Sequence, residues 1–147
     1  MPVSNIPHTD HVVHHVKPSL LKRDEERGVY GCFPDAFKMR DDENELSASW
    51  LEHFSGNRQE QLQKSALAIE ACGLTLKPSS GLAVLNVGAI HAAGEQCSVK
   101  VRVLHEPASN NPNPAYSTIR QLPRDNLELL GLLASVACVE TVEIKKL

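Results

Sequence analysis

The clearest signal for the fold is the stretch Asn57-Arg-Gln-Glu-Gln-Leu-Gln-Lys-Ser-Ala-Leu-Ala-Ile-Glu-Ala-Cys-Gly73. Asn57 is a good helix N-cap, and Glu60, three residues later, completes a box-like capping pattern. Apolar residues then recur at helical spacing, at Leu62, Ala66, Ile69 and Cys72. Gly73 supplies the stop signal. This stretch therefore predicts an amphipathic helix with one face in the core.

A second capped helix is predicted near the C-terminus. Asp125 is its expected N-cap, with Glu128 at the third position. One apolar stripe consists of Leu127, Leu130, Ala134 and Ala137, and it is widened by Leu129, Leu132, Leu133 and Val136. A stripe this broad indicates a helix that is buried along much of its surface.

Strand signals surround these helices. Residues 10–17, Asp-His-Val-Val-His-His-Val-Lys, are rich in β-branched residues and lie between two prolines. Residues 97–105 alternate, with valines on one face and Lys100 and Arg102 on the other, and residues 46–54 alternate similarly. Further strands are predicted over 36–40, 116–122 and 139–146, a loop over 28–34, and a helical turn over 90–93. The apolar run over 82–87 is too short to be assigned to a helix or a strand.

This order predicts one globular domain over residues 1–147 with an α+β fold. We expect a mixed or antiparallel sheet of about four to six strands, packed by two or three helices. The helices either cover one face of the sheet or belong to a small α/β layer protein, and the pattern leaves this choice open.

Composition restricts the class of protein. The formal charge is −3, with 15 basic residues interleaved among 18 acidic ones, so nucleic-acid binding is disfavoured. No apolar run approaches the roughly 20 residues that cross a bilayer, and the N-terminus does not resemble a signal peptide. The four cysteines form no Cys-x-x-Cys pair. These features predict a cytoplasmic protein with reduced thiols and no membrane association.

A histidine cluster is the first candidate for chemistry: His8, His11, His14 and His15. On a strand, His11 and His15 share a face but lie roughly 13 Å apart, too far for one metal ion. We therefore expect no metal site and no cofactor here. His15 is a candidate acid, base or ligand-binding group, and the alternative is a polar strand face.

The loop over residues 105–116 is the second candidate, because it is rich in Pro and Asn and long enough to be functional. His105 lies at a strand end beside Glu106, so it is a candidate general base that a carboxylate would orient. The alternative is a surface crossover whose Asn side chains satisfy the backbone of turns.

A predicted hairpin of residues 36–40 with 46–52 is the third candidate. Arg40 is suited to bind a phosphate or carboxylate, and Ser47, Ser49 and Glu52 lie on the facing segment. Outward polar residues on a half-exposed sheet explain the same pattern.

Three segments together resemble motifs of small uncharacterised bacterial proteins. They are residues 10–18, residues 36–37 with 46–51, and residues 105–107 with 111–119. The resemblance implies a bacterial single-domain protein and carries over no activity and no catalytic residue.

Three functions follow as hypotheses. The first is a small interaction or regulatory protein with a protein partner, an accessory of a bacterial assembly such as a toxin–antitoxin or phage-defence system. The second is a small enzyme acting on a nucleotide or another phosphorylated small molecule. In that enzyme Arg40 would hold the anion, while the acid or base and its orienting carboxylate would come from His15, His105, Glu52 and Glu106. The third is a His-rich metal-binding protein.

Overall fold

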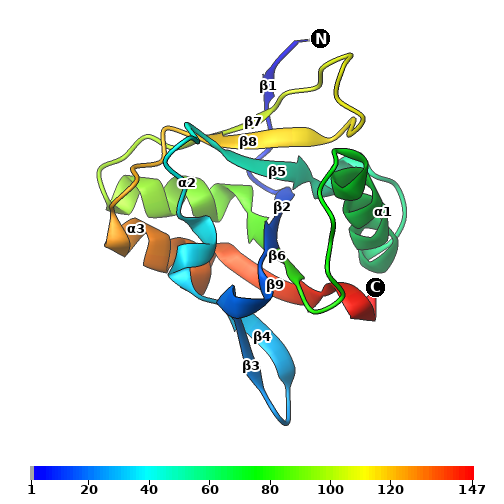
Figure 1. Ribbon diagram of the computed structural model, residues 1–147. Coiled ribbons are helices and arrows are strands. Elements are labelled where there is room, and N and C mark those ends of the chain that lie inside the picture. The colour runs from blue at the N-terminus through cyan, green and yellow to red at the C-terminus, as the bar shows by residue number, and fades with distance from the viewer. Residues whose placement is uncertain (1) are drawn as a thin grey trace.

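The computed structural model describes residues 2–147, and its main feature is a seven-stranded antiparallel sheet (Figure 1). The strand order is β1-β7-β8-β5-β2-β6-β9. The strands are β1 (Ser4–Asn5), β2 (His11–Val16), β5 (Leu46–Trp50), β6 (Gly81–Asn86), β7 (Arg102–His105), β8 (Tyr116–Arg120) and β9 (Cys138–Glu143). A separate hairpin consists of β3 (Leu21–Asp24) and β4 (Gly28–Cys32).

Within residues 2–147 three α-helices pack against this sheet: α1 (Arg58–Ala71), α2 (Val87–Gln96) and α3 (Leu127–Leu132). α3 continues as a π-helical segment, Leu133–Ala137. Short 3-10 helices occupy Pro18–Leu20, Pro34–Phe37, Leu51–His53 and Ile144–Lys146. The fold is therefore α+β with an antiparallel sheet, as predicted, but the sheet is larger than the expected four to six strands.

Both faces of the central strands are buried. Val12 and Val13 are each fully buried, and because successive side chains of a strand point to opposite faces they belong to two different cores. The larger core includes residues of α2 and α3, and the smaller one includes residues of α1. Figure 1 shows this arrangement, with α2 and α3 on one side of β2 and β6 and α1 on the other.

The first predicted helix is confirmed as α1. Asn57 Oδ1 accepts a hydrogen bond from Glu60 N at 2.9 Å, and Glu60 Oε1 accepts one from Asn57 N at 3.0 Å. Of the predicted apolar face, Leu62 and Ala66 are buried and Ile69 is half-buried, but Cys72, at the end of the helix, is exposed. Gly73 has a φ of 94°, a left-handed conformation that glycine adopts without strain, and it ends the helical run as predicted.

The second predicted helix forms with a shifted start. Asn126, not Asp125, is the N-cap, because its Oδ1 accepts from Leu129 N at 3.0 Å. Leu127 is consequently 75% exposed, while Leu129 and Leu130 are buried. The π-helical segment after α3 changes the angular step between side chains, so the predicted stripe does not continue along one straight line.

The predicted strand over residues 36–40 is wrong. A 3-10 helix begins at Pro34 and ends at Phe37. Proline has a fixed φ and no N–H to donate to a sheet, so Pro34 favours the start of a helix over a strand. Phe37 is fully buried in the larger core. The predicted hairpin of 36–40 with 46–52 is therefore absent, and β5 pairs with β2 and β8 instead.

The predicted loop over residues 28–34 is also wrong, because residues 28–32 form β4 and pair with β3. Gly28 has a φ of 69° at the start of this strand. Two other predicted strands are shorter than expected: β5 ends at Trp50, and β7 begins only at Arg102. The alternation predicted around β7 is confirmed, since Val101 and Val103 are buried and Arg102 is exposed.

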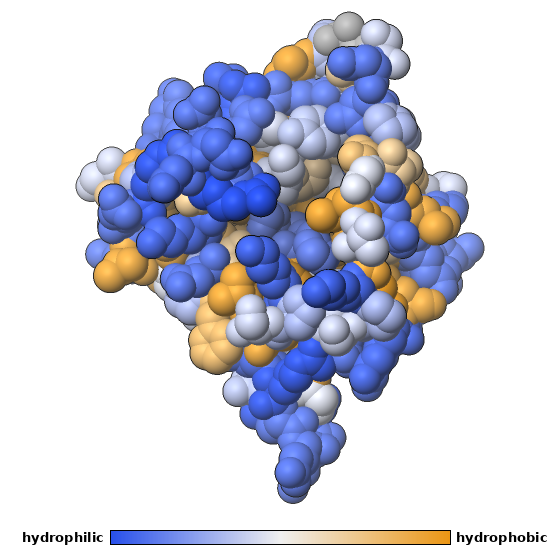
Figure 2. Space-filling model, in the orientation of Figure 1, coloured by the Kyte–Doolittle hydropathy of each residue, from blue (hydrophilic) through white to orange (hydrophobic). Residues whose placement is uncertain are grey.

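The β3–β4 hairpin projects from the body of the molecule beside β9, and its tip is covered by hydrophilic residues (Figures 1 and 2). An ion pair joins the two elements, with Arg23 Nη1 at 2.7 Å from Glu143 Oε2. Arg23 also donates to the carbonyl of Ser79. Lys145 Nζ lies 3.3 Å from the same Glu143 oxygen. The hairpin is thus fixed against one edge of the sheet, while the two-residue β1 forms the other edge.

Candidate functional site

A pocket opens where β2 and β5 stop pairing. These strands pair only at Val12 with Trp50 and at Val13 with Ser49, although β2 continues alongside β6 as far as Val16. The two strands therefore diverge, and a cavity of about 400 Å³ lies at the divergence. We call it the β2–β5 pocket; it is lined by Val13, His14, His15, Lys17, Leu20, Asp35, Ala36, Lys38, Arg40, Glu43, Leu46, Ser47, Ala48, Ile69, Cys72, Leu74, Asn113 and Tyr116.

His14 closes one side of the gap. Its Nδ1 lies 2.8 Å from the carbonyl oxygen of Ser47, and its Nε2 lies 2.9 Å from that of Ala36. Carbonyls only accept, so both contacts are hydrogen bonds only when the imidazole carries two protons. Burial lowers the pKa of His14, whereas the two carbonyls raise it and offset part of that effect. His14 is therefore a connection between β2, β5 and the 3-10 helix whose strength depends on protonation.

His15 contributes an unsatisfied polar atom to the same pocket. Its Nε2 is buried and has no hydrogen-bond partner among the residues that the structure describes. Burial lowers the pKa of His15, and the nearby positive charges of His14 and Lys17 lower it further. The imidazole is therefore neutral near pH 7. Buried polar atoms are nearly always paired, but no hydrogen bond from the described residues to Nε2 fixes the orientation of this ring.

The rim of the pocket carries more positive than negative side chains. Lys17, Lys38 and Arg40 line it, against Asp35 and Glu43. The side chain of Arg40 is 75% exposed, with its Nε 3.2 Å from Glu43 Oε1. With neutral histidines these side chains have a net charge of +1, which favours an anionic ligand.

The Pro- and Asn-rich loop forms another wall. Asn113 is buried, donates to Ser49 Oγ at 3.2 Å and accepts from Ala115 N at 2.9 Å. Tyr116, at the end of the loop, has its hydroxyl 3.1 Å from Ser47 Oγ. These two hydroxyls are hydrogen-bonding groups in the lining, so the loop contributes polar groups as well as a wall.

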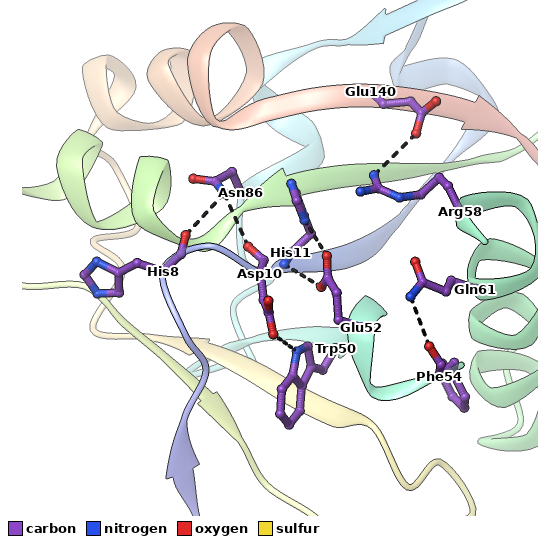
Figure 3. A network of polar contacts seen from close by, with 10 residues as sticks. All are labelled: His8, Asp10, His11, Trp50, Glu52, Phe54, Arg58, Gln61, Asn86 and Glu140. Atoms are coloured by element: carbon purple, nitrogen blue, oxygen red, sulfur yellow. Dashed lines mark hydrogen bonds and ion pairs between the residues drawn. The ribbon is translucent and has the colours of Figure 1, made fainter. Parts of the chain in front are cut away.

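Glu52 lies in the 3-10 helix Leu51–His53, where it contacts the first residue of β2 and does not line the pocket. Its Oε1 accepts from His11 N at 2.7 Å, and its Oε2 lies 2.6 Å from His11 Nδ1. Figure 3 shows this pair pointing toward each other beside the hydrogen bond from Trp50 Nε1 to Asp10 Oδ2, which measures 2.9 Å. Glu52 thus orients His11 and not His15.

His105 belongs to an aromatic cluster at the end of β7. Its ring meets Trp50 edge-on with centroids 5.1 Å apart, and the ring of His53 lies 5.5 Å away. Its Nε2 lies 2.8 Å from the carbonyl oxygen of Pro114. The neighbouring Glu106 makes no hydrogen bond with His105. Instead, its carboxylate accepts hydrogen bonds from Arg120 Nε at 2.9 Å and Nη2 at 2.7 Å.

The Glu106 carboxylate is held ionised by these contacts. Burial raises the pKa of Glu106, but hydrogen bonds from Arg120 and Thr118 outweigh it and keep the pKa below its ordinary value. A carboxylate bound in this way on both oxygens is a structural ion pair and a poor general base.

Of the five residues predicted from the sequence, His15 and Arg40 line the β2–β5 pocket, whereas Glu52, His105 and Glu106 lie elsewhere. Sequence reasoning did not single out Lys17 and Lys38. The only signal for Lys17 was its position at the end of the His-rich strand. Within residues 2–147 no group of three or more His, Cys, Asp or Glu side chains is arranged to hold a metal ion.

The chain was compared with known proteins as a whole. In the same described range, no helix is both long and apolar enough to cross a membrane. The β2–β5 pocket therefore stands on its own geometry, because the comparisons find no matching family model, no similar curated protein and no similar solved structure.

Proposed function

We propose that the protein binds a small molecule with an anionic group on an apolar body in the β2–β5 pocket, and that it is a regulatory or accessory protein responding to this ligand. The observation that carries the proposal is a cavity of about 400 Å³ in which Lys17, Lys38 and Arg40 stand beside apolar side chains. A protein partner for this role stays a prediction.

The size and lining of the pocket support a ligand of this kind. Small-molecule sites usually enclose roughly 300–1,000 Å³ and combine apolar walls with a few polar groups. Here the volume is about 400 Å³. Leu20, Ile69 and Leu74 offer apolar surface for the body of the ligand, and a carboxylate or phosphate would face Lys17 and Arg40.

Calorimetric binding tests the proposal with matched probes. The panel consists of inorganic phosphate, a nucleoside monophosphate, an aromatic carboxylate and the neutral amide of that carboxylate. We expect an anionic probe with an apolar body to bind more tightly than its neutral amide and more tightly than phosphate alone. Because the rim is solvent-exposed, this preference should weaken as salt is added.

Two variants locate the site. Arg40→Gln should weaken binding about fivefold, the effect of roughly 1 kcal/mol expected of an exposed charge pair. Arg58→Gln is the control, since Arg58 is also exposed, at 42% against 75% for Arg40, but lies 3.9 Å from Glu140 and does not line the pocket. Equal affinities of the two variants, or equal binding of the carboxylate and its amide, would refute the proposal.

A small enzyme acting on a phosphorylated compound is the second candidate, because His15 and Arg40 share one pocket. A neutral imidazole is the form that a general base requires, and burial favours that form of His15. Release of inorganic phosphate from a set of phosphate esters measures this activity. Phosphate release should disappear in His15→Asn. If the unsubstituted protein binds a probe but releases no phosphate, the enzyme hypothesis is refuted and only the binding function is supported.

A further inference from the structure

Two thiols meet between the hairpin and β9. Cys32 ends β4 and is buried, and Cys138 begins β9 and is half-buried. Both are free cysteines, and both line a second cavity of about 230 Å³. The chain thus places two reducing groups from distant segments next to a small opening.

The surroundings of the two sulfurs differ. Cys138 Sγ lies 3.4 Å from Thr141 Oγ1, which can donate to it, and 3.4 Å from the carbonyl oxygen of Glu140. Cys32 is surrounded by the larger hydrophobic core. The hydrogen bond from Cys32 lowers the pKa of Cys138 to about 6, although burial opposes this shift. The same contact, together with burial, raises the pKa of Cys32. Cys138 is thus the nucleophile of the pair.

We infer that Cys138 and Cys32 form a thiol site that is oxidised by small hydroperoxides and closes to a disulfide between β9 and the β3–β4 hairpin. The inference rests on the two free thiols lining one small cavity, which Lys22 and Thr141 also line. It is independent of the function proposed for the β2–β5 pocket.

The reaction has two balanced steps. First, the Cys138 thiolate attacks the terminal oxygen of the hydroperoxide and breaks the O–O bond, which gives a sulfenic acid at Cys138 and an alkoxide, or hydroxide from hydrogen peroxide. This leaving group takes up from water the equivalent of the proton that Cys138 released on ionising, and leaves as an alcohol or as water. Second, the Cys32 sulfur attacks the sulfenic sulfur, and the hydroxyl leaves as water with the Cys32 proton. The two thiols lose two electrons together, and the peroxide gains them.

Hydrogen peroxide and peptide mapping test the site on the full-length protein. After treatment of the reduced protein and blocking of the remaining thiols, we expect a crosslinked peptide pair that contains Cys32 and Cys138. Cys72→Ser, which removes an exposed thiol, should leave this crosslink intact. Cys138→Ser should abolish it and leave Cys32 reduced. If Cys32 and Cys138 stay unlinked in the unsubstituted protein, the inference is overturned.

Alkylation kinetics give a second readout that needs no variant, so a substitution that impairs folding does not obscure the result. The rate of Cys138 labelling by iodoacetamide should rise with a midpoint near pH 6, whereas an ordinary thiol has a midpoint of about 8.5. At that lower pH Cys138 should react roughly tenfold faster than a free cysteine compound, because a thiolate population on the order of 100-fold higher outweighs an about tenfold lower nucleophilicity. If the alkylation rate of Cys138 rises with a midpoint near that of the free cysteine compound, the assignment of Cys138 as nucleophile is contradicted. A crosslink formed by oxidised glutathione but not by peroxide contradicts the assignment of the oxidant.

Discussion

Replacing Asn113 with alanine tests how the Pro- and Asn-rich loop is held in the wall of the β2–β5 pocket. The amide of Asn113, 2% exposed, joins the loop to β5 by donating to Ser49 Oγ and satisfies the loop backbone by accepting from Ala115 N. Both of these partners are fully buried. Alanine therefore removes one amide and leaves two polar groups unpaired in the interior.

The size of the effect follows from these two groups. Leaving a buried donor or acceptor unpaired costs about 1–3 kcal/mol, so the two groups together should lower the free energy of unfolding of Asn113→Ala by about 2–6 kcal/mol. For a chain of this length that corresponds to a fall in Tm of roughly 5–20 °C. The variant should still fold, because typical domains are stable by about 5–15 kcal/mol.

Urea unfolding followed by the fluorescence of Trp50, the single tryptophan, measures this change. Asn110→Ala is the matched control, since Asn110 is exposed in the same loop, and its effect should stay within about 0.5 kcal/mol. Equal urea midpoints for the two variants would show that the Asn113 amide does not hold the loop, and the reasoning would be refuted.

Three further results are expected. Burial lowers the pKa of His14 and of His15, so folding favours the neutral rings. Stability measured by urea unfolding should therefore be fully present above about pH 6.5 and fall below it, by at most about 1.4 kcal/mol per pH unit for each ring. Gly94→Ala should destabilise α2 by about 1–3 kcal/mol because the new methyl group would lie 2.7 Å from a backbone carbonyl oxygen. Gly131→Ala, with no atom within 4 Å of the added methyl group, should instead stabilise α3 by up to about 1 kcal/mol, and thermal unfolding distinguishes the two. Glu143→Gln should speed proteolysis of the hairpin while the circular dichroism of the sheet is retained, because it removes the ion pair that holds the hairpin to β9.

Local signals explain which elements could be predicted. The start of α1 depends on Asn57 and Glu60, which lie within one turn of each other, so the sequence alone was sufficient. At α3 two adjacent residues, Asp125 and Asn126, are both good caps, and only the packing of the following leucines selects the second. β4 was missed because its glycines are typical of loops, and its strand conformation comes from pairing with β3.

The candidate site depends on relations that a sequence pattern does not contain. Residue types were enough to single out His15 and Arg40 as ligand-binding candidates. Their shared pocket results from the point at which β2 and β5 diverge, which is set by strand register. Likewise, no spacing motif joins Cys32 and Cys138, because it is the hairpin folding back against the last strand that brings both to one cavity.

The edges of the sheet bear on how the protein behaves when concentrated. An open strand edge offers unpaired amides and carbonyls on which a second molecule can add, and this is a common route to fibrils. Here one edge is the two-residue β1, too short to be a good template, and the other is flanked by the hairpin. Deleting residues 21–32 would remove the hairpin and expose the edge of β9. The truncated protein should then assemble into amyloid-like aggregates more readily than the full-length chain.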